Sequence, residues 1–124
     1  MSQGGRSPNR GGPLDLRDAL ERLEGDRALL DELLGLFLED CPPKLDALHR
    51  AAEQEDMETV HGLGHAMKGA AANLSLGPIH EAAYRVECAG KEGRVADARN
   101  AVKELDAEFE RLKKFLSSMS FPAA

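Results

Sequence analysis

The sequence predicts an all-α fold, specifically an antiparallel four-helix bundle with a short additional N-terminal helix. Apolar residues recur every three or four positions along most of the chain, which is the spacing of amphipathic helices. No alternating pattern typical of a strand lasts more than a few residues. Aromatic residues make up only 4% of the chain, so the core must be built from Leu, Ala, Val and four Phe, a mixture that favours helix.

Length, charge and cysteine content restrict the class of protein. A chain of 124 residues fits one compact domain. The formal charge of −6 argues against a nucleic-acid partner, because a phosphate backbone repels an acidic surface. No apolar run approaches the ~20 residues that cross a bilayer, and the start lacks the apolar region of a signal peptide. We therefore expect a cytoplasmic protein without membrane insertion. Two Cys do not make a disulfide framework.

Residues 1–13 differ in composition from the rest of the chain. They contain four of the twelve Gly, two of the six Pro, two Arg and no acidic residue. A segment of this kind cannot bury enough apolar surface to become ordered. We therefore predict a flexible linker or tail over 1–13 and a helical domain over 14–120.

Helix-capping residues and stripes of apolar residues predict the first two helices. Asp15 can cap a short helix, and Gly25-Asp26 can end it and cap the next one. The Pro42-Pro43 pair interrupts the second helix, because proline removes a backbone donor. A kink is favoured there, since the apolar phase resumes afterwards, and two separate helices are the alternative. The apolar stripe of this segment is Leu30, Leu33, Phe37, Cys41 and Leu48.

Three more helices complete the predicted bundle. One runs from about 56 to 75, and Gly77-Pro78 begins the next, since proline suits the first helical turn. A turn over 90–93 leads into the last and most regular helix. Short turns between amphipathic helices make neighbours antiparallel. The last helix carries Val95, Ala98, Val102, Leu105, Phe109, Leu112 and Leu116 on one stripe.

His65 is the candidate functional residue, because it lies opposite the apolar stripe of the helix over 56–74. Lys68 follows by one turn, so its ammonium can stabilise an anionic group, such as a phosphoryl, on the ring. Glycines nearby cost up to ~1 kcal/mol each relative to Ala, and access for a partner would compensate. The pattern supplies a nucleophile, a counter-charge and a cleared approach, but no general base. The predicted buried stripe is Val60, Leu63, Met67, Ala70 and Leu74, and the glycines are Gly62, Gly64 and Gly69.

The segment HAMKGAAANL over 65–74 resembles the signature of the histidine-containing phosphotransfer (HPt) domain family. In that family the His is followed, after two residues, by Lys-Gly, small residues and an aliphatic residue. The similarity extends over 26–41, 81–90 and 95–116. The sequence departs from the family pattern in three places. Met67 stands where Leu, Ile or Phe is common, and Ser75 stands where a Gly often follows the aliphatic residue. The two glycines just before the His, Gly62 and Gly64, are also unusual.

The resemblance implies a phosphorelay intermediate. His65 would accept a phosphoryl group from a receiver-domain aspartate and pass it to another receiver domain. Lys68 would neutralise phosphoryl charge, and Gly69 would leave room for the group. Such a protein is a phosphoryl carrier rather than an enzyme. It needs no cofactor of its own, and Mg²⁺ is expected on the partner receiver domain. The implied partners are response-regulator receiver domains, with a hybrid histidine kinase as a second candidate.

Receiver binding in this family uses apolar surface near the phospho-accepting His. We therefore expect a partner surface that includes His61, Gly62, Ala72 and Leu38. His61 and His65 are four residues apart, a spacing that can also bind a metal, but a zinc site needs more ligands.

Three alternative functions use the same helix. The domain could be the phospho-accepting part of a chemotaxis-type histidine kinase, with ATP bound on a separate catalytic domain. It could be an interaction module that moves no phosphoryl group. It could also be a helical metal binder that uses His61 and His65.

Overall fold

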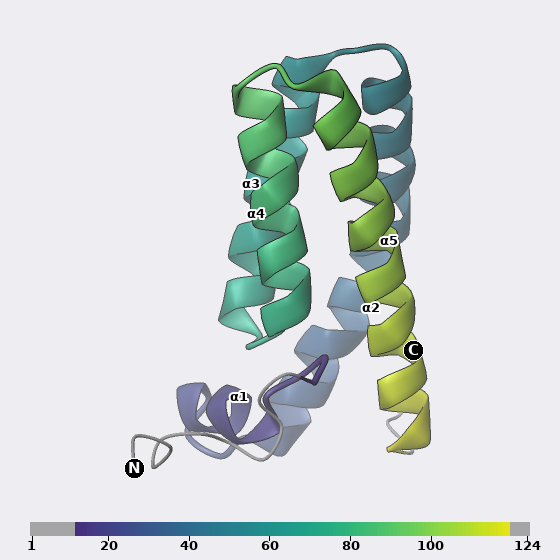
Figure 1. Ribbon diagram of the computed structural model, residues 1–124. Coiled ribbons are helices and arrows are strands. Elements are labelled where there is room, and N and C mark those ends of the chain that lie inside the picture. Colours follow the sequence, from purple (N-terminus) through teal and green to yellow (C-terminus); the bar gives the residue numbers. More distant parts are fainter. Residues whose placement is uncertain (1–11, 120–124) are drawn as a thin grey trace, which may run out of the picture.

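The computed structural model describes residues 12–119, and all regular structure within that range is helical. Helices α2 to α5 form an antiparallel four-helix bundle, and the short α1 lies at the end where α3 turns into α4 (Figure 1). The predicted fold class is confirmed. Apart from Gly12 and Pro13, the predicted linker over 1–13 lies outside the described residues. The helices are α1 (Leu16–Arg22), α2 (Arg27–Glu53), α3 (Met57–Asn73), α4 (Gly77–Lys91) and α5 (Val95–Ser118).

Local sequence signals set the start of the first three helices. The side chains of Asp15, Asp26 and Asp56 each accept a hydrogen bond from the backbone N–H three residues later. These bonds satisfy donors that have no partner within the helix. Gly25 and Gly93 occupy the turns before α2 and α5 with φ of +82° and +70°, which glycine adopts without strain. The predicted caps at Asp15 and Asp26 are confirmed.

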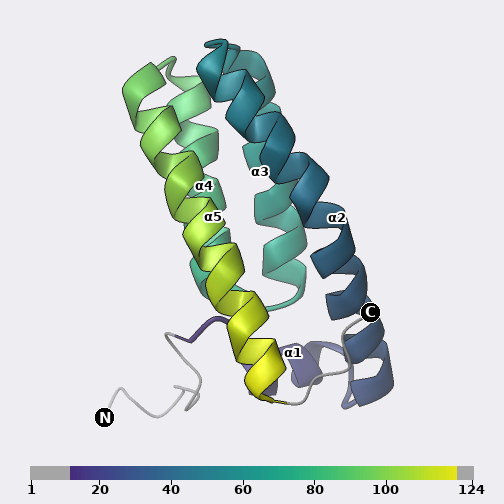
Figure 2. The same cartoon turned by 90° about the vertical axis from the view of Figure 1, so that its right-hand side faces the viewer.

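Helix α2 continues through Pro42 and Pro43 as one helix (Figure 2), so the alternative of two separate helices is wrong. Both prolines face solvent, whereas Cys41 and Leu45 on either side of them are buried. The prolines cost the helix two backbone donors. Burial of the opposite face holds the helix together across this gap, because tertiary packing supplies most helical stability in proteins.

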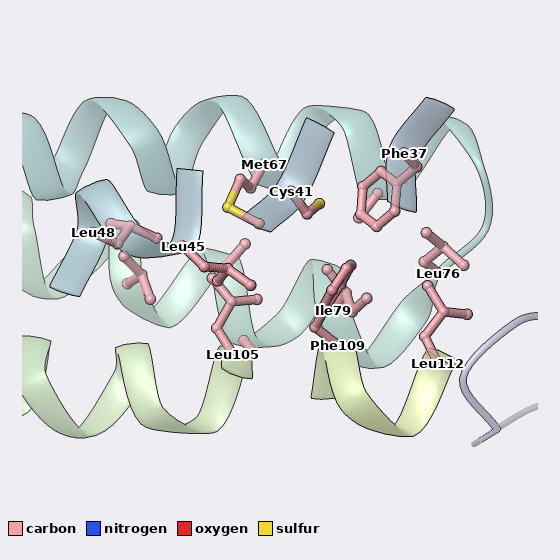
Figure 3. Close-up of a cluster of buried hydrophobic side chains, with 14 of the residues drawn as sticks. Phe37, Cys41, Leu45, Leu48, Met67, Leu76, Ile79, Leu105, Phe109 and Leu112 are labelled. Carbon is pink, nitrogen blue, oxygen red and sulfur yellow. The ribbon is translucent and has the colours of Figure 1, made fainter. Parts of the chain in front are cut away.

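The core runs along the bundle axis and receives side chains from α2, α3, α4 and α5 (Figure 3). The rings of Phe37 and Phe109 meet across it, with centroids 6.4 Å apart and planes tilted by 50°. Such tilted pairs add to the stabilisation that burial provides. The labelled core residues are Phe37, Cys41, Leu45, Leu48, Met67, Leu76, Ile79, Leu105, Phe109 and Leu112.

Helix α1 is attached to the turn between α3 and α4 by two hydrogen bonds. The backbone N–H of Asp15 donates to the carbonyl of Ser75 at 3.0 Å, and the Ser75 hydroxyl donates to Asp18 Oδ2 at 2.6 Å. Ser75 has a φ of +59°, in the left-handed region that favours glycine. Glycine would be unstrained at this position, but it would lack the hydroxyl that holds α1.

This attachment predicts a pH-dependent effect of Asp18→Asn. Hydrogen bonds from Ser75 and Arg22 hold the pKa of Asp18 below its ordinary value of 3.8. The hydrogen bonds to the Asp18 carboxylate stabilise the folded state fully when the pH is above the ordinary pKa of an aspartate. This stabilisation is lost as the pH falls through the lowered pKa that Asp18 has in the folded state. We expect the variant to be less stable at pH 7 by up to about 1 kcal/mol, since the carboxylate is half-exposed.

Urea unfolding at neutral and acidic pH measures this effect. The stability difference between Asp18→Asn and the unsubstituted protein should shrink as the pH falls towards about 2. Asp97→Asn is the control, because Asp97 forms an exposed pair with Arg94 within one turn. A stability difference for Asp18→Asn that stays constant with pH would contradict the assignment.

Candidate functional site

His65 lies on the outer face of α3, and 67% of its side chain is exposed. This exposure agrees with the sequence prediction. A Cβ atom added at Gly62 or Gly69, one turn to either side, would meet no atom within 4 Å. The surface around the ring is therefore open to an approaching molecule. Ala72, two turns along the helix, is half-buried.

The buried face of α3 differs from the predicted stripe. Leu63 and Ala70 are only half-buried, whereas Gly64 and Ala71 are buried. The reason is the close contact between α3 and α4. A Cβ atom at Gly64 would lie 2.7 Å from the backbone nitrogen of Glu87. Gly64 therefore permits helix packing, and the interpretation of all three glycines as access for a partner is wrong for this one.

Glu87 on α4 is the site residue that the sequence analysis missed. Its Oε2 atom accepts a hydrogen bond from Nδ1 of His65 at 3.0 Å. Its Oε1 atom lies 2.7 Å from Nζ of Lys68, and only 15% of the side chain is exposed. The structure therefore adds a carboxylate that contacts both His65 and Lys68. The partner comes from a different helix, so it does not appear in the pattern of α3 alone.

The surroundings of Glu87 keep it ionised and fix the proton on the His65 ring. The Lys68 ammonium, with a smaller contribution from His65, lowers the pKa of Glu87 against the opposing effect of burial. A carboxylate beside Nδ1 favours the tautomer that carries its proton on Nδ1. The lone pair is then on Nε2. In this tautomer the free Nε2 atom, on an exposed ring, can act as a nucleophile.

Lys68 is directed towards α4 rather than towards open solvent. Its side chain is 25% exposed, and its ammonium lies 5.3 Å from the ring centroid of Tyr84 as well as beside Glu87. The structure therefore brings Lys68 and His65 to the same carboxylate. The predicted role of Lys68 as a counter-charge for a group on His65 stays a prediction.

The predicted partner residues lie in different environments. His61 is close to the same acid, with Nε2 3.8 Å from Glu87 Oε2. Leu38 is half-buried and packs against the core, whereas Leu36 is 49% exposed. Leu36 lines a cleft of about 590 Å³ between α1, α2 and α3. Its other lining residues are Arg22, Leu23, Leu33, Phe37, Asp40, Ala70, Asn73 and Leu74.

Three further features of the described residues concern a thiol site, a metal site and membrane insertion. Burial raises the pKa of the Cys41 thiol to about 12, so this cysteine is not a thiolate at neutral pH. Within residues 12–119, no group of three or more His, Cys, Asp or Glu side chains is arranged to hold a metal ion. None of the helices over this range is long and apolar enough to span a membrane.

Comparison with known proteins identifies one family. The family model of the Hpt domain matches residues 32–115, which is more than half of the chain. The matched range contains all of α3 and α4, and with them His65, Lys68 and Glu87. Neither the comparison with curated proteins nor that with solved structures found a match.

Proposed function

Because this chain belongs to the Hpt domain family, whose members are phosphocarrier modules of phosphorelay signalling, we propose that it is a relay intermediate. In this proposal His65 accepts a phosphoryl group from the aspartate of one receiver domain and passes it to another. The observation that carries the proposal is the environment of the His65 imidazole. Its Nδ1 atom is hydrogen-bonded to the Glu87 carboxylate, and 67% of the side chain is exposed.

The chemistry of the step follows from this geometry. The Nε2 lone pair attacks the phosphorus of an aspartyl phosphate, the P–O bond breaks, and the receiver carboxylate leaves. The Nδ1 proton stays in place, so the ring becomes a phosphorylated imidazolium. Glu87 balances the positive charge that develops on the ring, which is electrostatic stabilisation by a group already in position. Transfer to the next receiver reverses each of these steps.

The remaining residues of the site have supporting roles. Lys68 exchanges part of its contact with Glu87 for contact with the phosphoryl oxygens, as a charge-assisted bond. Gly69 leaves space for the phosphoryl group, since a Cβ there would meet open solvent. The chain supplies no cofactor, and the Mg²⁺ that aspartyl phosphate chemistry uses belongs to the receiver domain.

The receiver domain docks over His65 and the neighbouring apolar surface. The cleft beside Leu36 extends this surface along α3, because Asn73 in its lining is eight residues, or about 12 Å, from His65. Exposed apolar area of this kind is typical of protein interaction sites. His61, Gly62, Ala72 and Leu38 are the sequence-predicted members of the surface.

A two-step transfer assay tests the proposed function. The protein is incubated with a receiver domain carrying radioactive aspartyl phosphate, repurified, and mixed with a second, unphosphorylated receiver domain. We expect label on the chain that is labile in acid and stable in base, as for a phosphohistidine, and its movement to the second receiver. Absence of such label with every receiver tested would contradict the proposal. Labelling by a chemotaxis-type kinase and ATP alone would instead favour the kinase-domain alternative.

Glu87 provides a prediction within this assay. Glu87→Ala should slow acceptance of the phosphoryl group by about 10- to 100-fold, since a hydrogen bond to a charged group contributes about 1.5–3 kcal/mol. Glu87→Gln keeps an acceptor for Nδ1 but not the charge, and its rate should fall between the two. Single-turnover rates with one charged receiver measure this order. Equal rates for all three proteins would show that Glu87 does not support the ring.

A further inference from the structure

His61 is the second imidazole at the candidate site. It lies one turn before His65 on α3, and the two ring centroids are 6.5 Å apart with planes tilted by 31°. Its side chain is 40% exposed. The backbone around it touches α4, because a Cβ at Gly90 would lie 2.5 Å from the backbone nitrogen of His61. This close approach keeps the ring near the carboxylate of Glu87.

Both imidazole rings lie near the same oxygen, Oε2 of Glu87, at different distances. His65 Nδ1 is 3.0 Å from Glu87 Oε2, which is a hydrogen bond, whereas His61 Nε2 is 3.8 Å from it. The longer separation is beyond a hydrogen bond but within the range of an ion pair. A neutral His61 therefore leaves Oε2 to His65. A protonated His61 is attracted to the carboxylate and can share the oxygen.

Sharing of the Glu87 carboxylate matters because several cationic groups compete for its single negative charge. The one carboxylate already faces the Lys68 ammonium through Oε1. Within residues 12–119, Glu87 is the acid that forms an ion pair with His61. Glu58 on α3 and Lys91 on α4 are exposed. Among the described residues, neither of them forms an ion pair with the His61 ring, and no residue of α2 or α5 does so. Protonated His61 would thus be one more cation on a carboxylate that the phosphorylated His65 ring also needs.

We infer that His61 is a positioning residue that acts through Glu87 and makes phosphoryl transfer sensitive to pH. Protonation of His61 draws Oε2 towards it and weakens the support of the developing imidazolium on His65. Histidine is the side chain that proteins commonly use to respond to pH near neutrality. This inference rests on the proposed function, in which His65 carries the phosphoryl group.

The first test needs no phosphoryl transfer, and so it can fail independently of the proposed function. The ¹³C resonance of the Glu87 side-chain carboxylate is sensitive to the charge of groups that contact its oxygens. We expect its pH dependence in the unsubstituted protein to differ from that in His61→Gln, which lacks one of the two imidazoles near Oε2. His80→Gln is the matched control, because His80 is also half-buried but forms no ion pair among the described residues. A Glu87 titration that His61→Gln leaves unchanged would overturn the inference.

The second test compares rates of phosphoryl acceptance from one charged receiver domain at pH 6 and pH 8. Ionisation of the receiver affects all variants alike, so the informative quantity is the ratio of rates between variants. The rate of His61→Gln relative to the unsubstituted protein should be about three- to fivefold higher at pH 6 than at pH 8. His80→Gln should match at both values. The same ratio for His61→Gln at both pH values would overturn the inference, because a purely structural role does not depend on protonation.

Discussion

A chain carrying His65→Gln should accept no phosphoryl group from any charged receiver domain, while it folds like the unsubstituted protein. Glutamine has no nucleophilic nitrogen, so the N–P bond cannot form. Because 67% of the His65 side chain is exposed and glutamine suits a helix, we expect little change in stability. Filter-binding or gel assays of radioactive label measure the first result, and circular dichroism with urea unfolding measures the second.

A matched substitution controls for the loss of an imidazole in general. His80→Gln removes a half-buried imidazole from α4, outside the contacts of Glu87. It should accept label at the normal rate. Label that persists in His65→Gln would place the phosphoryl group on another residue, and His61 would then be the first candidate. That outcome would refute the assignment of His65.

Gly64→Ala should destabilise the protein by about 2 kcal/mol, although alanine is the better helix former. The new Cβ would lie 2.7 Å from the backbone nitrogen and 3.0 Å from the Cα atom of Glu87. Backbone atoms cannot turn aside as a flexible side chain can, so α3 and α4 must separate. Separation also moves Glu87 away from the His65 ring, and phosphoryl acceptance should slow in the fraction that remains folded.

Gly62→Ala is the counterpart on the same helix. A Cβ at Gly62 meets no atom within 4 Å, so this substitution should stabilise the protein by up to about 1 kcal/mol. Urea unfolding of both variants measures the contrast. If both alanines stabilise the fold, the close contact at Gly64 does not exist in solution.

The sequence was sufficient for the features that depend on neighbours along the chain. The caps at Asp15 and Asp26 and the exposure of His65 depend on residues within a turn or two, and helical periodicity describes them. Pro42 and Pro43 show the limit of such signals. A local rule predicts an interruption, but packing of α2 against the bundle outweighs it.

The features that sequence reasoning missed depend on contacts between α3 and α4. The role of Gly64 requires knowledge of which backbone lies opposite, and Glu87 is 22 residues from His65. One signal could have indicated Glu87. It is an acid one turn from Ala83 and from Gly90, both buried on α4. A half-buried carboxylate needs a cationic or donor partner, and α3 supplies both.

The attachment of α1 bears on where the smallest autonomous folding unit begins. The family match starts at residue 32, inside α2, yet Leu14 and Leu30 are fully buried. A truncated fragment that starts at residue 32 would lose both side chains. It would also lose the two hydrogen bonds that join Ser75 to Asp15 and Asp18. Loss of these contacts would loosen the end of α3 that follows the His65 segment. The cooperative unit that presents His65 in a fixed position therefore begins near Leu14.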